Sequence, residues 1–426
     1  MNIQEEARKM KLASPRMAST AGEVRNAALL GIAKALEENK TAIFSANAED
    51  LAAADAAGIS AAVKKRLKFD EGKLTACLDG LRQLAELPDP VGRVLLRREM
   101  DAGLILTKLS CPIGVIGVIF EARPDALVQI SSLCIKSGNC AVLKGGKETA
   151  RTNRALFMLI HAAAVEAGLP KECLLQAELH NEIGELLTCD RDVDLLIPRG
   201  SNAFVRYIMD NTKIPVMGHA DGICHIYVDK DADQEKALRV IVDAKTQYTA
   251  ACNAVETVLV DRPIATEFLP KLAKALADAG VELRGSREAA KIVPVAEVMD
   301  DDAFAKEYLD LILSAAVVDG PAAAAEHINR FGSHHTDSIL TENDVAWEVF
   351  RALVDSAGVY RNVSTRFADG FRYGFGAEVG ISTSKIHARG PVGLDGLMTY
   401  KYLIEGDGQI VGDYASGKAA FHFRDL

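Results

Sequence analysis

The sequence predicts an α/β protein with a mostly parallel sheet, divided into two or three domains. The first observation is order, because short β-rich apolar runs alternate with longer helical patterns, which is typical of βαβ units. The second is length, since 426 residues at roughly 150 per domain favour more than one domain. The third is composition: 49% hydrophobic and 25% charged residues are globular values and exclude a disordered, collagen-like or coiled-coil chain.

Residues 1–87 follow a helical pattern, in which apolar side chains such as Val24 and Ile32 share one face. Pro88 and Gly92 end this region. The elements expected next are strands over 103–110 and 113–120, a helix over 125–137, a strand over 139–144, a helix over 148–167, and short strands over 174–176, 195–198, 215–217 and 225–229.

A second unit is expected to start near Asp229. Its pattern again alternates helix and strand, which predicts a second parallel arrangement. The expected elements are a helix over 232–247, a strand over 255–260, a helix over 265–279, a strand over 309–318 and a helix from residue 322.

The chain is acidic, with 49 lysine and arginine residues against 59 aspartate and glutamate residues and a net charge of −10. This balance argues against nucleic acid or an anionic membrane as the main partner. An anionic ligand must therefore be held by a local cluster of positive groups.

The cysteine pattern indicates reduced thiols, because no CxxC pair occurs and the spacings are too long for a disulfide scaffold. The eight cysteines stand at 77, 111, 134, 140, 173, 189, 224 and 252. The N-terminus lacks the apolar region of a signal peptide, and the most apolar run, residues 113–120, is far too short to span a bilayer. We expect a soluble cytoplasmic protein without a membrane partner.

Two turns between a predicted strand and a helix are candidate phosphate sites. One is Lys144-Gly145-Gly146-Lys147, where lysines and glycines would let a phosphate approach a helix N-terminus. For so short a match, an ordinary turn with solvated lysines is the better explanation when the motif is taken alone. The other turn, Arg199-Gly200-Ser201, is also explained by helix capping, with Ser201 or the following asparagine as the N-cap.

Cys252 lies among small residues, between a predicted helix and a predicted strand. A thiolate is a strong nucleophile when a dipole or a cation lowers its pKa, but most free cysteines are buried and inert. The histidines His219, His225, His334 and His335 form two local groups. No HExxH motif or Cys/His quartet accompanies them, so we expect no metal.

The order of five segments resembles the aldehyde dehydrogenase superfamily, and within it the reductases that act on glutamyl 5-phosphate in proline biosynthesis. The segments are Cys111 to Pro124, Ser137 to Lys144, Arg199 to Ser201, Gly218 to Asp229, and Cys252. The distinctive matches within and beyond them are residues 120–125, 143–148, 218–225, 308–313 and 380–391, which are spread over most of the chain in the expected order.

The resemblance implies an aldehyde dehydrogenase-like fold with a Rossmann-like coenzyme domain, an α/β catalytic domain and a small β oligomerisation element. The coenzyme domain would take residues 1–98 and 112–230, the catalytic domain 231–390, and the oligomerisation element 99–111 and 391–426. A homodimer or higher homo-oligomer follows from such an element. The resemblance also suggests a functional association with glutamate 5-kinase.

The resemblance assigns the nucleophile to Cys252. It implies that Lys144, with Gly145 beside it, reaches the adenosine ribose, that Gly200 and Ser201 lie near the pyrophosphate, and that Glu307 holds the nicotinamide ribose. Lys147 stands where NAD-preferring relatives often carry glutamate. A cation there can pair with a 2′-phosphate, so we expect NADP(H).

Two departures from the hydrolytic aldehyde dehydrogenases favour an acyl phosphate over water. The motif that supplies their water-activating glutamate begins here with His219, and their oxyanion asparagine aligns with Ala122. The implied reaction is NADPH-dependent reduction of L-glutamyl 5-phosphate to L-glutamate 5-semialdehyde, with release of phosphate through a Cys252 thioester. Oxidation of a free aldehyde to an acid, or nucleotide binding without catalysis, are the alternatives.

Three further residues are candidates for contacts with the substrate. Arg123 and His219 would hold the phosphate or the transition-state charge, and Asn253 would orient the substrate. An internal ion pair for Arg123 and a structural hydrogen bond for His219 are the alternatives. The His334-His335 pair is interpreted as loop structure.

Overall fold

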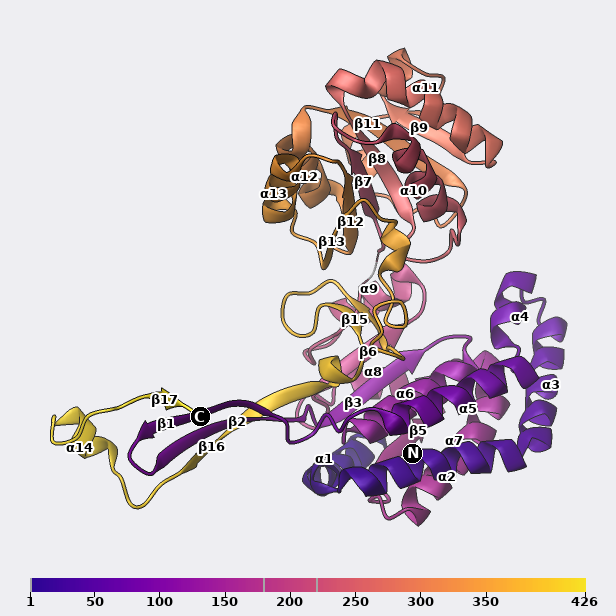
Figure 1. The fold of residues 1–426 in the computed structure, drawn as a ribbon. Helices are drawn as coiled ribbons and strands as arrows, with labels where there is room; N and C mark the ends of the chain where they lie inside the picture. Colours follow the sequence, from indigo (N-terminus) through magenta and orange to yellow (C-terminus); the bar gives the residue numbers. More distant parts are fainter. Residues whose placement is uncertain (1, 179–180, 220) are drawn as a thin grey trace. The chain divides into compact units, whose positions relative to one another are not determined.

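The computed structural model describes residues 2–178, 181–219 and 221–426 (Figure 1). The chain forms two compact units. Unit 1 consists of Met1–Met217, Phe375–Gly380 and Val392–Leu426, and unit 2 of Gly218–Gly374 and Ile381–Pro391. Unit 2 is thus inserted into the chain of unit 1. These units are defined by contacts, and the coenzyme, catalytic and oligomerisation roles of the domains expected from the sequence stay predictions.

Helices fill the N-terminal part of unit 1, as the pattern over residues 1–87 predicts. Side chains such as Leu29 and Ile32 are buried on the inner face of the second helix. The helices of unit 1 are α1 (Ile3–Ser19), α2 (Gly22–Glu38), α3 (Lys40–Ala56), α4 (Ala61–Leu67), α5 (Glu71–Glu86), α6 (Pro124–Lys136), α7 (Ala150–Glu166), α8 (Asn181–Leu187), α9 (Asn202–Asp210) and α14 (Val411–Ala415).

A four-stranded parallel sheet forms the centre of unit 1. In spatial order its strands are β5 (Leu174–Ala177), β4 (Cys140–Gly145), β3 (Val115–Phe120) and β6 (Leu195–Arg199). Strand β3 is buried at every position, as expected for a parallel strand covered on both faces. The strand predicted over 215–217 is wrong in extent, because it is reduced to one bridge between Leu196 and Val216.

An antiparallel ribbon in unit 1 joins segments that are far apart in the sequence (Figure 1). Its order is β16 (Met398–Glu405), β2 (Leu104–Pro112), β1 (Val94–Asp101) and β17 (Arg424–Asp425). The strand predicted over 103–110 corresponds to β2. Large apolar side chains remain exposed along the ribbon and its connections: Val94, Leu95, Tyr400, Tyr402, Ile404, Ile410, Val411 and Phe423.

Unit 2 is built on a seven-stranded sheet in which every pair is parallel. The spatial order is β10 (Val298–Met299), β9 (Glu282–Ser286), β11 (Ile312–Val318), β8 (Val255–Asp261), β7 (Cys224–Val228), β12 (Thr336–Leu340) and β13 (Gly358–Arg361). The strand predicted over 309–318 starts later, because Leu309 has a left-handed φ of 55° that an extended strand excludes.

Helices cover both faces of this sheet (Figure 1). Ile226 and Val228 pack with α10 (Gln234–Thr246) and α11 (Arg262–Asp278), whereas Tyr227 between them packs with α12 (Gly320–Phe331) and α13 (Asp344–Leu353). Successive residues of a strand point to opposite faces, so β7 serves two cores. Residues that come just before its neighbours β8 and β12 belong to the site described below.

A short two-stranded sheet, β14 (Gly380–Ser382) and β15 (Gly390–Val392), lies where the chain passes between the two units. No helix in the described part of the chain has the length and apolar character needed to cross a bilayer.

Candidate active site

Cys252 lies in the turn between the end of α10 and the start of β8, in unit 2. The turn is closed by hydrogen bonds from the N–H of Ala251 to the carbonyl of Tyr248 and from the N–H of Ala254 to the carbonyl of Ala251. Within the described chain, the backbone N–H of Cys252 donates to no acceptor. The side chain is partly exposed, so a ligand can reach the sulfur.

Two imidazoles flank the sulfur. Nε2 of His335 lies 3.2 Å from Sγ of Cys252, and Nδ1 of the same ring lies 2.9 Å from the hydroxyl of Thr336. His219 also hydrogen-bonds Cys252. Its Nδ1 lies 2.8 Å from the carbonyl oxygen of Ile381, which can only accept, so Nδ1 carries the proton and Nε2 is left for the sulfur.

These contacts change the pKa of both partners. Burial alone would raise the pKa of the Cys252 thiol, but His335 and His219 more than offset it and hold the pKa well below its ordinary value of 9.0. Burial would lower the pKa of His219, yet the charge of Cys252 and the hydrogen bond to it raise that pKa to about 9. The favoured state at neutral pH is a thiolate beside an imidazolium at His219.

The backbone at Gly222 approaches Cys252 closely. A Cβ atom added to Gly222 would lie 2.5 Å from Cα of Cys252, so only glycine fits. The thiol of Cys224, two residues later, donates to the carbonyl of Cys252 at 3.4 Å. The motif that contributes His219 therefore also fixes the position of the nucleophile.

A buried guanidinium lies near the thiolate. Arg366, in a short 3-10 turn over Thr365–Phe367, is 9% exposed, and its Nε donates to Oε1 of Gln247 at 2.9 Å. Burial lowers the pKa of Arg366, while the charge of Cys252 acts against that shift. No carboxylate in the described ranges forms an ion pair with this guanidinium, although such partners are usual for a buried charge.

Asn253, the residue after the nucleophile, is 3% exposed. Its Nδ2 donates to the carbonyl of Ala368 at 2.8 Å, and its Oδ1 is buried without a partner among the described residues. Buried polar atoms are normally satisfied, so an unpaired oxygen beside the nucleophile suits a donor on a ligand. The predicted role in orienting the substrate stays a prediction.

Glu307 lies close enough to His219 to contribute to its raised pKa. It also affects Glu256, whose pKa is raised to about 7 by burial against the opposing effect of Lys245. Lys245 and Glu256 form a fully buried ion pair at 2.7 Å, and Glu256 accepts from the N–H of Leu309 at 3.5 Å. This pair supports the segment that carries Glu307.

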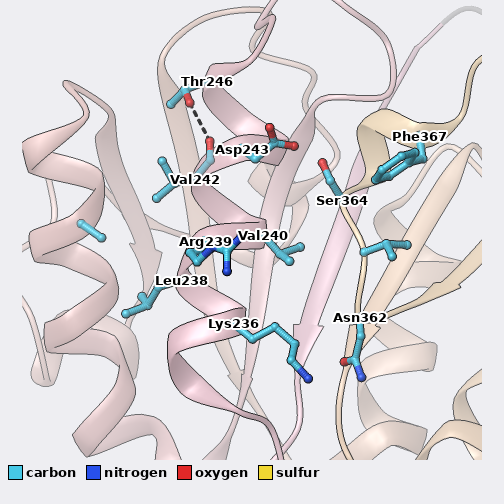
Figure 2. Close-up of a pocket in the computed structure, with 12 residues that line it drawn as sticks. Lys236, Leu238, Arg239, Val240, Val242, Asp243, Thr246, Asn362, Ser364 and Phe367 are labelled. Atoms are coloured by element: carbon cyan, nitrogen blue, oxygen red, sulfur yellow. Dashed lines mark hydrogen bonds between the residues drawn. The ribbon is translucent and has the colours of Figure 1, made fainter. Parts of the chain in front are cut away.

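A cavity of about 820 Å³ opens elsewhere in unit 2, between α10 and the segment 362–367 (Figure 2). Ser364 and Phe367 line it together with Lys236 and Asp243 of α10. Neither Cys252 nor the two histidines belong to its lining.

The candidate cofactor residues other than Glu307 lie in unit 1. Lys144, at the carboxyl end of β4, is 4% exposed, and its ammonium donates to the carbonyl of Gly145 at 2.7 Å. No carboxylate in the described part of the chain forms an ion pair with Lys144, and burial lowers its pKa. A buried ammonium with donors to spare fits the oxygens of a nucleotide. Lys147 is exposed, in the turn that precedes α7.

The second turn is already occupied in part. The N–H of Ser201 donates to Oε2 of Glu121 at 3.1 Å, and a Cβ atom on Gly200 would meet the same carboxylate. A pyrophosphate at this N-terminus of α9 would have to displace Glu121. The predicted contacts of Gly200 and Ser201 with the cofactor stay a prediction.

Arg123 is exposed at the N-cap position of α6. No ion pair of Arg123 is formed within the described ranges. Ala122 before it has a left-handed φ of 49°, and its N–H donates to Oε1 of Glu148 at 2.7 Å. The expected role of Arg123 in holding the phosphate or the transition-state charge stays a prediction, because Arg123 belongs to unit 1 and Cys252 to unit 2.

A family model for the aldehyde dehydrogenase family matches residues 1–310, which is more than half of the chain. The chain belongs to the aldehyde dehydrogenase family. It is an oxidoreductase of that family, with the aldehyde dehydrogenase-like fold that the sequence predicts, and the family implies a nicotinamide cofactor.

Within the aldehyde dehydrogenase family, the chain groups with proteins named gamma-glutamyl phosphate reductase. One from Pelotomaculum thermopropionicum is 54% identical over 426 residues, which is 100% of this chain and 98% of the relative. One from Synechococcus elongatus is 52% identical over 98% of this chain and 97% of the relative. The crystal structure of gamma-glutamyl phosphate reductase from Thermotoga maritima is 37% identical, covers 96% of this chain and 100% of its own, and has a TM-score of 0.94.

Two residues of the site are not marked as functional by the sequence. They are His335, which the sequence predicts to be part of a loop, and Arg366, for which the sequence predicts no role. Left-handed backbone at His334, with a φ of 59°, turns the chain just before His335. Two adjacent histidines were the one signal available for His335, and no local pattern marked Arg366.

Proposed function

We propose that the chain reduces L-glutamyl 5-phosphate to L-glutamate 5-semialdehyde with NADPH and releases inorganic phosphate, in proline biosynthesis. The observation that carries the proposal is the surroundings of the thiolate. Within the described residues, the side chains that hydrogen-bond Sγ of Cys252 are His219 and His335, and neither is the glutamate that activates water in the hydrolytic aldehyde dehydrogenases. Such a site favours transfer of the acyl group to and from phosphate over hydrolysis.

The first step is attack of the Cys252 thiolate on the acyl phosphate carbonyl, with departure of phosphate and formation of a thioester. The unpaired N–H of Cys252 is a donor for the developing oxyanion, a type of contact whose loss typically costs about 100- to 1000-fold in rate. The imidazolium at His219 supplies positive charge beside the departing dianion. When bound, the reduced nicotinamide supplies the hydride that converts the thioester carbonyl to the aldehyde.

Arg366 is the candidate for an acidic group of the substrate. It is buried, close enough to Cys252 to interact with its charge, and without an ion-paired carboxylate among the described residues. A guanidinium in this state can bind a carboxylate or a phosphate by two parallel hydrogen bonds. Both groups occur in glutamyl 5-phosphate, one at each end.

The choice of NADP over NAD rests on Lys147. The side chain is exposed and two positions after Gly145, at the turn that follows β4. A free ammonium there pairs with a 2′-phosphate, whereas a glutamate would repel it. Lys144 is proposed to bind the adenosine ribose, Gly200 and Ser201 to lie near the pyrophosphate, and Glu307 to bind the nicotinamide ribose.

Assembly and location complete the proposal. The antiparallel ribbon of β16, β2, β1 and β17 exposes large apolar side chains that a second copy of the chain could cover, which supports a homodimer or larger homo-oligomer. A functional association with glutamate 5-kinase would pass an unstable acyl phosphate directly to the reductase. Reduced cysteines fit a cytoplasmic enzyme.

The reaction run in reverse separates the proposal from aldehyde oxidation. Glutamate 5-semialdehyde is incubated with NADP⁺, with and without inorganic phosphate, and NADPH and glutamate are measured. We expect turnover that requires phosphate. Phosphate-independent release of glutamate would instead assign the chain to the aldehyde oxidisers. No turnover, together with Cys252 labelling no faster than the other cysteines, would indicate nucleotide binding without catalysis.

A further inference from the structure

Three ligand atoms of a kind that zinc prefers meet at the candidate nucleophile. They come from His219, Cys252 and His335, and all lie within 4.8 Å of one another. The three residues are far apart in the sequence, so no sequence motif with metal-ligand spacing contains them. Their convergence depends on β7 and β12 being neighbours in the unit 2 sheet.

The separations suit a tetrahedral ion. Zinc binds thiolate sulfur at about 2.3 Å and imidazole nitrogen at about 2.0–2.1 Å, which places tetrahedral ligands roughly 3.3–3.6 Å apart. Nε2 of His335 and Sγ of Cys252 are 3.2 Å apart, and the third atom lies within the 4.8 Å limit. The three atoms are therefore at or near the separations that one tetrahedral ion requires.

The second ring nitrogen of each histidine is held as in metal centres. Ligating imidazoles usually bond their other nitrogen to a carbonyl, carboxylate or similar partner, which fixes the tautomer and the ring orientation. The carbonyl of Ile381 does this for His219 at 2.8 Å, and the hydroxyl of Thr336 does it for His335 at 2.9 Å. Both rings therefore direct Nε2 toward the sulfur.

We propose that His219, Cys252 and His335 form an inhibitory zinc site, with three protein ligands and a fourth position open to water. Cys252 is not fully enclosed, since the residue as a whole is partly exposed. Coordination withdraws electron density from the thiolate, and the ion occupies space beside the sulfur, so we expect attack on an acyl group to be strongly slowed while zinc is bound. This inference rests on the geometry of the three residues and does not require the proposed substrate.

The first test is binding without turnover. The full chain is treated with a chelator to remove metal and dialysed against zinc, and the bound zinc per chain is measured. A second sample of the treated protein is titrated with Co²⁺, because a thiolate-to-cobalt charge-transfer band shows that sulfur is a ligand. We expect one zinc per chain and a cobalt band that Cys252→Ser abolishes. His335→Gln removes a ligand, so it should weaken zinc binding by more than ~10- to 100-fold, which is the usual loss when a residue that hydrogen-bonds a ligand is replaced.

Matched variants keep the test decisive if a ligand substitution impairs folding. Thr336→Val removes the hydroxyl that hydrogen-bonds Nδ1 of His335, and this change should weaken zinc binding about 10- to 100-fold. Thr336→Ser keeps the hydroxyl and should bind zinc as the wild type does. Cys111→Ser, on β2 in unit 1, controls for adventitious binding by a partly exposed thiol and should change nothing.

The second test is inhibition. Zinc should inhibit the wild-type reaction competitively with the acyl phosphate, and a chelator should restore it fully. Equal zinc binding by wild type, Cys252→Ser and His335→Gln would overturn the proposal, as would unchanged zinc sensitivity of the residual activity of His335→Gln. If the chain binds zinc at this site but does not reduce glutamyl 5-phosphate, the proposed function fails and the zinc site stands.

Discussion

Nε2 of His335 lies 3.2 Å from Sγ of Cys252, and His335 is fully buried. Cys252 precedes β8 and His335 precedes β12, and these two strands lie on opposite sides of β7. The contact that lowers the pKa of the Cys252 thiol therefore joins two segments that the sheet brings together. The electrostatic state of the thiol depends on the sheet being assembled.

Replacing His335 by glutamine should impair both catalysis and thiol activation. We expect kcat/KM to fall about 100-fold or more, in line with the loss of an acid–base partner. The pKa of Cys252, measured in a chelator from the pH dependence of iodoacetamide labelling, should rise toward its ordinary value of 9.0. His161→Gln, on the exposed face of α7, is the control. An unchanged labelling profile would mean that His335 is structural.

The rate should fall as pH rises through about 9. The pKa of His219 is raised to about 9 from 6.5, so its imidazolium is present below that value and is lost above it. The linked stability has the same sign: it is present below pH 6.5 and lost as pH rises through about 9. His219→Gln should abolish this alkaline limb in both kcat/KM and the free energy of unfolding. Persistence of the limb in the variant would assign it to another group.

Arg366→Gln should weaken substrate binding, because a hydrogen bond to a charged group contributes about 1.5–3 kcal/mol, or roughly 10- to 150-fold in KM. Two substrates separate the two acidic groups. If Arg366 binds the α-carboxylate, butyryl phosphate, which lacks that group, should lose nothing in the variant. If it binds the departing phosphate, both substrates should suffer equally. An unchanged KM for both substrates would leave Arg366 as support for the thiolate.

Lys147→Glu should discriminate between the two coenzymes. We expect KM for NADPH to rise about 10-fold or more, since a charge-assisted contact is replaced by repulsion, and KM for NADH to change little. Lys34→Glu, an exposed substitution on α2, controls for the change in net charge. Equal weakening of both coenzymes would show that Lys147 does not read the 2′-phosphate.

Gly222→Ala should displace the nucleophile. The new methyl group would lie 2.5 Å from Cα of Cys252, and overpacking of this kind typically costs about 1–3 kcal/mol. We expect a lower melting temperature and a loss of kcat/KM that exceeds the loss in stability. Gly80→Ala, inside α5 with no atom within 4 Å, is the matched control and should be neutral or stabilising by up to ~1 kcal/mol. Wild-type kinetics for Gly222→Ala would show that the turn adapts.

Much of the fold could be predicted because buried parallel strands are continuous apolar runs. Residues 113–120 and 255–260 are such runs, and they form β3 and β8. The errors occur where backbone geometry overrides the pattern. Leu309 is apolar and continues the run of β11, but its left-handed φ delays the strand to Ile312.

The site was less predictable, because its members meet only in three dimensions. Cys252 was assigned by resemblance, since its local sequence alone resembles that of an inert cysteine. His335 follows another histidine, and nothing local distinguishes which ring reaches the sulfur. Arg366 lies in a short turn, where one arginine among many has no periodicity to mark it. The burial of these residues and their neighbours in the folded chain identify them as candidate site residues, whereas their spacing in the sequence does not.

The insertion of unit 2 within unit 1 has a consequence for how the chain folds during synthesis. Strand β2 of unit 1 pairs with β1 on one side and with β16 on the other, and β16 is made after unit 2, whereas all seven strands of the unit 2 sheet lie within Gly218–Gly374. We therefore expect unit 2 to finish its sheet first, while unit 1 holds only the β1–β2 pair of its ribbon and the β16 edge of β2 stays open. A ribosome stalled before Met398 should carry a protease-resistant unit 2 and a protease-sensitive ribbon.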